Sequence, residues 1–266
     1  MTQTTPPTTT APPAPPKPAN PLVGPGLLLL WIGMGAALVA APSGPLSFAF
    51  VLLGWVLAVM VHEFAHAATA WLGGDRTVTE KGYLSFDPRR YGDVGVSLVI
   101  PLVALLMGGV GFPGGAVYIR NDLLRGPLWR SAAAAAGPAA TLLVLLVLSF
   151  GLSFWAGWGV AGPGPLALFA ALTVLAFLQV MALMLNLLPA PGLDGFSILR
   201  PFLPAPLQFR SRRAEGLVML LLLLALLAPH GLGSYLFRWA AQASLTLGLD
   251  LNALLAGWRA FHFWER

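Results

Sequence analysis

Long apolar runs alternate with short polar segments along this chain. The runs fall at 25–41, 47–72, 94–111, 131–158, 165–188 and 217–228. A helix needs roughly 20 apolar residues to cross a bilayer, and several runs reach that length. The run at 94–111 carries Pro101 and ends in glycines, and residues 114–119 after it, GGAVYI, have the composition of a short strand. The pattern predicts an all-α polytopic membrane protein with about five to six transmembrane helices and a re-entrant helix/strand segment near 94–119.

The two ends of the chain differ from the apolar middle. Residues 1–24 are rich in Pro and Thr with one charge, so we expect a disordered tail. A first helix then starts the membrane-embedded core at 25–233, because the region before it is too long and too poorly charged for a signal peptide. Residues 234–266 alternate Trp, Phe, Leu and Arg, which predicts an interfacial amphipathic segment.

Composition supports this class and restricts the chemistry. The chain has 266 residues, 57% hydrophobic and 9% charged, with a mean hydropathy of +0.78. Cysteine is absent, which excludes disulfides and thiolate metal sites, so a metal must be held by His, Asp or Glu. The net charge of +5 is explained by loop charges that orient the protein, so no nucleic-acid partner is expected.

The run at 47–72 contains HEFAH. His62 and His66 are four residues apart, so on a helix both imidazoles leave one face and can bind one metal ion. Glu63 lies beside them and can take a proton from an attacking water, which is the chemistry of zinc hydrolases. The alternative is that these side chains only bond neighbouring helices. Against it, Glu63 is the one acidic residue within the long apolar runs, and a charge in a membrane by default marks a functional site.

A catalytic zinc usually has three protein ligands and one open position. The best candidate for the third is Asp194 in NLLPAPGLDG, residues 186–195. The prolines and glycines end the helix and keep the segment irregular, so it can return a carboxylate to a neighbouring helix. An ordinary helix-ending loop would show the same Pro/Gly pattern. The rival acidic ligands are Glu80, Asp87 and Asp93 in the loop 73–93.

Three motifs together resemble the site-2 protease family of intramembrane zinc metalloproteases. They are HEFAH in a membrane helix, AAAGPAA at 134–140 and NLLPAPGLDG, and the similarity runs from about residue 45 to 200. The resemblance implies one zinc per chain with His62, His66 and Asp194 as ligands. It also implies Glu63 as catalytic base and Asn186 as a polar group that contacts substrate or the oxyanion.

The chain departs from that family's pattern at two positions. Thr141 stands where Asn is common, which weakens any role for position 141. Phe196 follows Gly195 where a second Gly is common, which leaves the metal site intact. No insertion of PDZ size is present, so substrate filtering by such a domain is not implied.

The motifs also constrain topology. His62 lies roughly 15 Å from the C-terminal end of its helix, so Asp194 must emerge on that side of the membrane. His62 and Asp194 reach the same side only if the run 94–111 enters the membrane and returns to the side it came from. Under re-entry the loops 42–46 and 159–164 on the other side carry no Lys or Arg, which predicts a cytoplasmic N-terminus and active-site side. The basic residues then share one side: those of 73–93 and Arg120, Arg125, Arg130, Arg200, Arg210, Arg212 and Arg213.

The sequence therefore predicts a zinc endopeptidase of the cell membrane that hydrolyses peptide bonds within or next to transmembrane segments of other proteins. Its expected partners are a membrane-spanning protein substrate and the lipid bilayer. Three alternatives stay open: a metal-ion transporter or sensor with the same ligands, a catalytically silent membrane scaffold that would tolerate loss of Glu63, and a membrane peptidase for soluble or juxtamembrane substrates.

Overall fold

A computed structural model of the chain describes residues 20–91, 117–228 and 230–265. The regular elements among the described residues are all helices, with no strand among them. The long helices are α1 (Val23–Ala40), α2 (Gly44–Gly73), α5 (Pro127–Gly157), α6 (Pro163–Asn186) and α8 (Ala205–Leu227). Shorter elements are α3 (Thr77–Glu80), η1 (Pro88–Arg90), α7 (Asp194–Leu199), η3 (Arg200–Phe202), α9 (Leu232–Thr246), α10 (Leu251–Phe261) and η4 (Phe263–Glu265).

The all-α polytopic architecture is confirmed. In the described ranges, α1, α2, α5 and α6 are long and apolar enough to span a membrane. A fifth span results if Arg213–Leu227 and Leu232–Thr246, which meet at a 73° bend, count as one. The run 94–111 and the glycines of GGAVYI lie outside the described residues, so re-entry stays a prediction, and Val117–Ile119 show no regular secondary structure.

Proline and glycine set the helix limits. Pro lies in the first turn of α2, α5 and α6, where its missing N–H would have no intrahelical partner. Gly74 ends α2 with a φ of +122°, a conformation that glycine adopts without strain. One boundary differs from expectation: α8 starts at Ala205, twelve residues before the apolar run 217–228 begins. Pro206 fits its first turn and no proline follows within the helix.

Helix α6 is the centre of the bundle. Its side chains Val174, Phe177, Met181 and Leu185 are buried in the main apolar core. Helix α5 instead exposes large apolar residues along one side, among them Leu143, Phe150 and Phe154. In a chain with several membrane spans, such a surface is the one that faces lipid.

One end of the bundle holds the loops on both sides of residues 92–116. Asp75 is fully buried and accepts hydrogen bonds from Thr77 N (3.0 Å) and Arg120 N (2.7 Å). Arg125 N donates to Gly73 O at 3.0 Å. Tyr91 and Val117 belong to one apolar cluster beside α2. Both flanks therefore meet at the end where α2 finishes.

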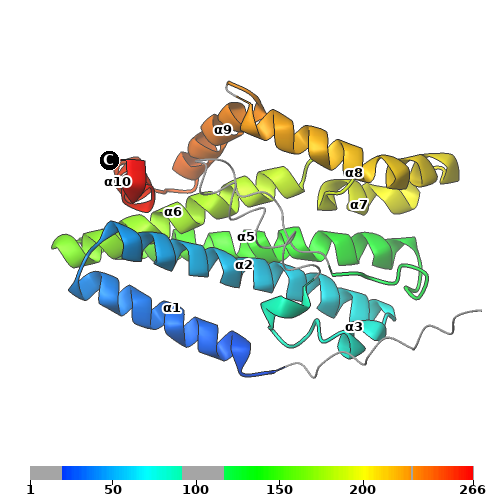
Figure 1. The fold of residues 1–266 in the computed structure, drawn as a ribbon, viewed down its shortest axis with the longest axis horizontal. Coiled ribbons are helices and arrows are strands. Elements are labelled where there is room, and N and C mark those ends of the chain that lie inside the picture. Colours follow the sequence, from blue (N-terminus) through cyan, green and yellow to red (C-terminus); the bar gives the residue numbers. More distant parts are fainter. Residues whose placement is uncertain (1–19, 92–116, 229, 266) are drawn as a thin grey trace, which may run out of the picture.

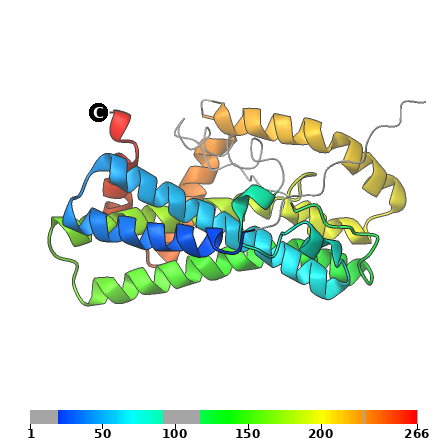
Figure 2. The ribbon, with the colours of Figure 1, turned by 60° about the horizontal axis from the view of Figure 1, so that its bottom comes forward.

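The C-terminal helix lies at the opposite end. Figures 1 and 2 place α10 at one end of the molecule and α3 at the other. A Cβ at Gly257 would lie 2.4 Å from the carbonyl oxygen of Ala170, and one at Gly44 would lie 2.4 Å from Cβ of Phe263. The C-terminal segment thus packs closely on α6 and on the start of α2.

Candidate metal centre

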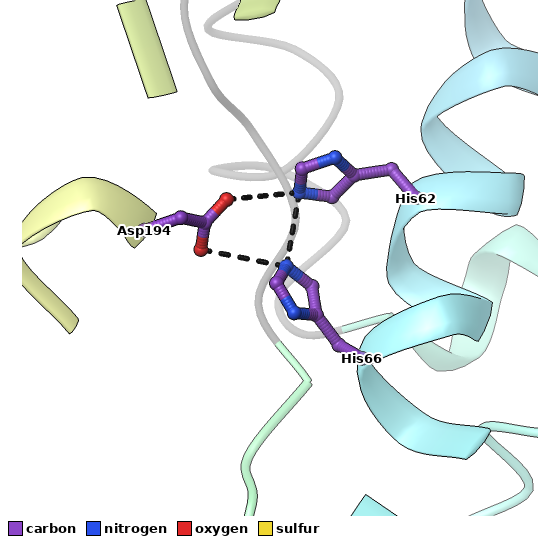
Figure 3. A group of neighbouring side chains, drawn as sticks. All are labelled: His62, His66 and Asp194. Carbon is purple, nitrogen blue, oxygen red and sulfur yellow. Dashed lines mark hydrogen bonds and ion pairs between the residues drawn. The ribbon is translucent and has the colours of Figure 1, made fainter. Parts of the chain in front are cut away.

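Helix α2 carries both histidines to the inside of the bundle. One helical turn separates them, and the two Nε2 atoms lie 3.0 Å apart. Both residues are buried, and so is Glu63, which is 3% exposed. The helical spacing expected from HEFAH is therefore present, with both imidazoles turned to the same point (Figure 3).

Asp194 reaches this point from the first residue of α7. Its Oδ2 lies 3.1 Å from His62 Nε2 and its Oδ1 lies 3.4 Å from His66 Nε2. The loop before it turns at Gly192 with a φ of +101°. Gly195 fits against the end of α6, where a Cβ would lie 2.3 Å from the carbonyl oxygen of Leu187. Without side chains at these glycines, the segment folds back and faces α2 (Figure 3).

Two of the three rival acidic ligands, Glu80 and Asp87, do not join this group. Across the described ranges, the one group of three metal-binding side chains is His62, His66 and Asp194, whose ligand atoms lie within 4.8 Å of one another. Asp87 is instead paired with Arg89, which donates to both carboxylate oxygens at 2.8 and 2.7 Å. These hydrogen bonds hold the pKa of the Asp87 carboxyl below its usual value. Asp93 lies outside the described residues.

Helix α5 orients both imidazoles. His66 Nδ1 lies 2.7 Å from the carbonyl oxygen of Ala133, and His62 Nδ1 lies 2.9 Å from Thr141 Oγ1. A carbonyl oxygen only accepts, so Nδ1 of His66 carries a proton, and Nε2 is the nitrogen left for a metal. A metal-binding histidine typically donates its other N–H to such an oxygen, which fixes the tautomer.

The donor set fits a divalent cation. In the neutral imidazole, Nε2 of His66 and the carboxylate oxygens of Asp194 are all acceptors, and a cation bound between them satisfies both. Gly137 leaves the space for this arrangement. A Cβ there would lie 2.2 Å from Nε2 of His66 and 2.6 Å from Nε2 of His62. Two imidazoles and one carboxylate are a zinc donor set with one position left for water or substrate.

Glu63 is held from outside its own helix. The backbone N of Val117 donates to Glu63 Oε2 at 3.1 Å. Both residues line a cavity of about 570 Å³ that also contains the two histidines and Asp194. Asn186 lines the same cavity and is 8% exposed. All five residues named for the site are thus brought to one cavity.

Sequence reasoning missed several residues around this cavity. It discounted Thr141, whose hydroxyl contacts His62. The carbonyl of Ala133 and the N–H of Val117 are backbone groups. Residue type therefore gives no indication that they contact the site. Gln179 also lines the cavity, and an amide inside an apolar membrane helix is a signal that could have been used.

Comparison with known proteins places the chain among metalloproteases. It is 37% identical over 220 residues to "Putative zinc metalloprotease Rip2" of Mycolicibacterium smegmatis, with 82% of each chain covered. It is 40% identical over 184 residues to the protein of the same name in Mycobacterium tuberculosis, with 68% of each chain covered. "Putative zinc metalloprotease YwhC" of Bacillus subtilis is 26% identical over 195 residues, or 70% of this chain and 83% of that protein.

Two further comparisons gave no match. No family model matches the chain. No solved structure matches it either. The relatives' coverage and identity, together with the site, nevertheless define the relationship, and the chain belongs to the site-2 protease family, alongside the zinc metalloproteases named Rip2.

Proposed function

We propose that the protein is an intramembrane zinc endopeptidase that cuts within or next to transmembrane segments of other proteins. One observation carries the proposal. Two imidazole nitrogens and a carboxylate converge inside a bundle of membrane-length helices, and a buried glutamate lines the same cavity. Ionisable groups at that depth are expensive and need a functional reason.

His62, His66 and Asp194 would hold one zinc ion. The metal, when bound, supplies a Lewis acid that polarises the attacking water and the peptide carbonyl. Glu63 takes the proton from that water and returns it to the leaving amine, and the Val117 N–H keeps the carboxylate in place. Asn186 lines the same cavity, so its amide is available to the oxyanion or to a substrate backbone group.

The proposed orientation is supported by the distribution of charge. The site end of the bundle carries most of the basic residues, including Arg76, Lys81, Arg89, Arg90, Arg120 and Arg125. The connections 41–43 and 158–162 at the other end have none. Cytoplasmic loops are enriched in Lys and Arg, so the N-terminus and the active-site side would be cytoplasmic.

The direct test uses purified full-length protein in liposomes with membrane-spanning peptide substrates. We expect cleavage by the zinc-loaded protein and none by Glu63→Gln, which keeps all three ligands and the size of the side chain. Metal analysis of both proteins should give one zinc per chain. A wild-type protein that holds zinc and cuts only soluble peptides would support the juxtamembrane or soluble-substrate alternative.

The transporter alternative needs metal-binding groups on several helices along a path. In the part of the chain that the structure describes, one group of three such side chains is found. Zinc flux into liposomes by Glu63→Gln protein would favour that alternative.

A further inference from the structure

Gln179 carries a buried side-chain nitrogen that has no hydrogen-bond partner in the described structure. It lies on α6, is 3% exposed and lines the cavity beside the metal centre. Its Nε2 is buried and has no hydrogen-bond partner among the described residues. Thr173 on the same helix shows the contrast, because its buried hydroxyl donates to Phe169 O at 2.8 Å. A buried donor without a partner is unfavourable, so an acceptor that reaches Gln179 through the cavity it lines would remove that cost.

The depth of Gln179 follows from helix packing. Helices α2 and α6 run in the same direction, and a Cβ at Gly54 would lie 2.7 Å from Cδ2 of Leu175. Four residues further along each helix are Ala58 and Gln179, and both line the cavity. Ala58 precedes His62 by one helical turn. Gln179 is therefore about one turn, roughly 5 Å, deeper in the bundle than the metal site.

Gln179 shares a face of α6 with Asn186. Both residues line the cavity and are seven positions apart, which is about 10 Å along a helix. An extended peptide covers that length with about three residues. The two amides thus lie along a path that an unwound segment could follow from the metal into the membrane.

We propose that the Gln179 amide donates a hydrogen bond to a backbone carbonyl of the substrate, on the membrane side of the bond that is cut. This inference rests on the proposed function. A substrate helix that unwinds in an apolar cavity loses its internal hydrogen bonds, and each freed carbonyl then needs a donor. Gln179 supplies one about one helical turn deeper in the bundle than the metal site. Because it binds backbone, it favours substrates that unwind easily over those with a particular side chain.

The test compares Gln179→Leu with Thr173→Val in purified full-length protein. Both changes remove a buried polar group from α6, but only Gln179 lines the cavity. We expect Gln179→Leu to lower kcat/KM for a membrane-spanning peptide about tenfold, in line with one lost hydrogen bond. Zinc content should stay at the wild-type value, Tm should not fall, and Thr173→Val should cut at the wild-type rate.

A second measurement separates substrate binding from a structural role. In the peptide, single backbone amides on the membrane side of the cut are replaced by esters, whose carbonyls accept more weakly. At one position the ester should slow the wild-type protein and have no further effect on Gln179→Leu. Equal losses in both proteins at every position would overturn the inference, as would wild-type kcat/KM in Gln179→Leu.

The outcomes also distinguish this inference from the proposed function. If the wild-type protein and Gln179→Leu cut the membrane-spanning peptide equally well, only the role of Gln179 is overturned. A zinc-loaded wild-type protein that cuts no membrane-spanning peptide overturns the proposed function and this inference with it.

Discussion

The backbone N–H of Val117 donates a hydrogen bond to the carboxylate of Glu63 at 3.1 Å. A residue on a connecting segment thus fixes a side chain of helix α2. Val117→Pro removes this N–H, so we expect kcat to fall about 10- to 100-fold, the effect of losing a hydrogen bond to a charged group. Zinc content should not change, because no ligand is touched. Val117→Ala is the matched control, since it keeps the N–H and should keep most of the activity.

Asp194→Ala should strongly reduce zinc binding, because it removes one of three proposed ligands. The measurement is zinc per chain after dialysis against a weak chelator. Asp87→Ala is the control, because that carboxylate is paired with Arg89 and lies outside the group. Full zinc occupancy in Asp194→Ala would show that another residue is the third ligand.

Gly137→Ala should disturb the metal centre without removing any ligand. The added Cβ would lie 2.2 Å from His66 Nε2, so the imidazoles must move. We expect zinc affinity to fall at least about tenfold, as for other changes next to ligands. Gly151→Ala on the same helix meets nothing within 4 Å and should bind zinc normally. Equal affinities in the two variants would contradict the packing of Gly137 against the histidines.

Thr141→Val tests the orientation of His62. It keeps the shape of the side chain and removes the hydroxyl that lies 2.9 Å from His62 Nδ1. Zinc affinity should fall about 10- to 100-fold, and Thr141→Ser should restore it because the hydroxyl returns. A competition titration with a fluorescent zinc chelator measures both variants. If the Thr141→Val variant binds zinc as tightly as the wild-type protein, the hydroxyl does not orient His62.

Membrane topology can be tested with single cysteines, because the native chain has none. Arg120→Cys lies at the site end and should label from the cytoplasm. Ala161→Cys and Asn252→Cys lie at the other end and should label from outside. Ala161 is preferable to Gly162, whose φ of +88° makes a cysteine there strained. Labelling of all three from one side would refute the arrangement.

The sequence predicted those parts of the site that depend on local geometry. The spacing of His62 and His66 fixes their common face on any helix, and the structure shows it. Asp194 could be predicted as a candidate ligand because prolines and glycines mark where a helix ends. Its approach to α2 depends on tertiary packing. The helix limits near 44–73 and 163–186 also followed from the apolar runs.

Other contacts could not be predicted because they join elements far apart in sequence through groups that every residue has. The carbonyl of Ala133 and the N–H of Val117 look like any other backbone group until the fold places them beside His66 and Glu63. Thr141 was discounted by comparison with a common Asn, yet its hydroxyl reaches His62. The tight packing of α10 on α6 could not be predicted from the sequence either, because it depends on small residues such as Gly257 where the two helices cross.

The order of the proposed ligands along the chain has a consequence for biosynthesis. The two histidines emerge from the ribosome early, with α2, whereas Asp194 follows only after α5 and α6. A nascent chain therefore holds an incomplete donor set throughout most of its insertion into the membrane. Under the proposed function, peptide hydrolysis would start only after Asp194 docks beside the two histidines, so a chain made up to α6 would not yet cut its neighbours.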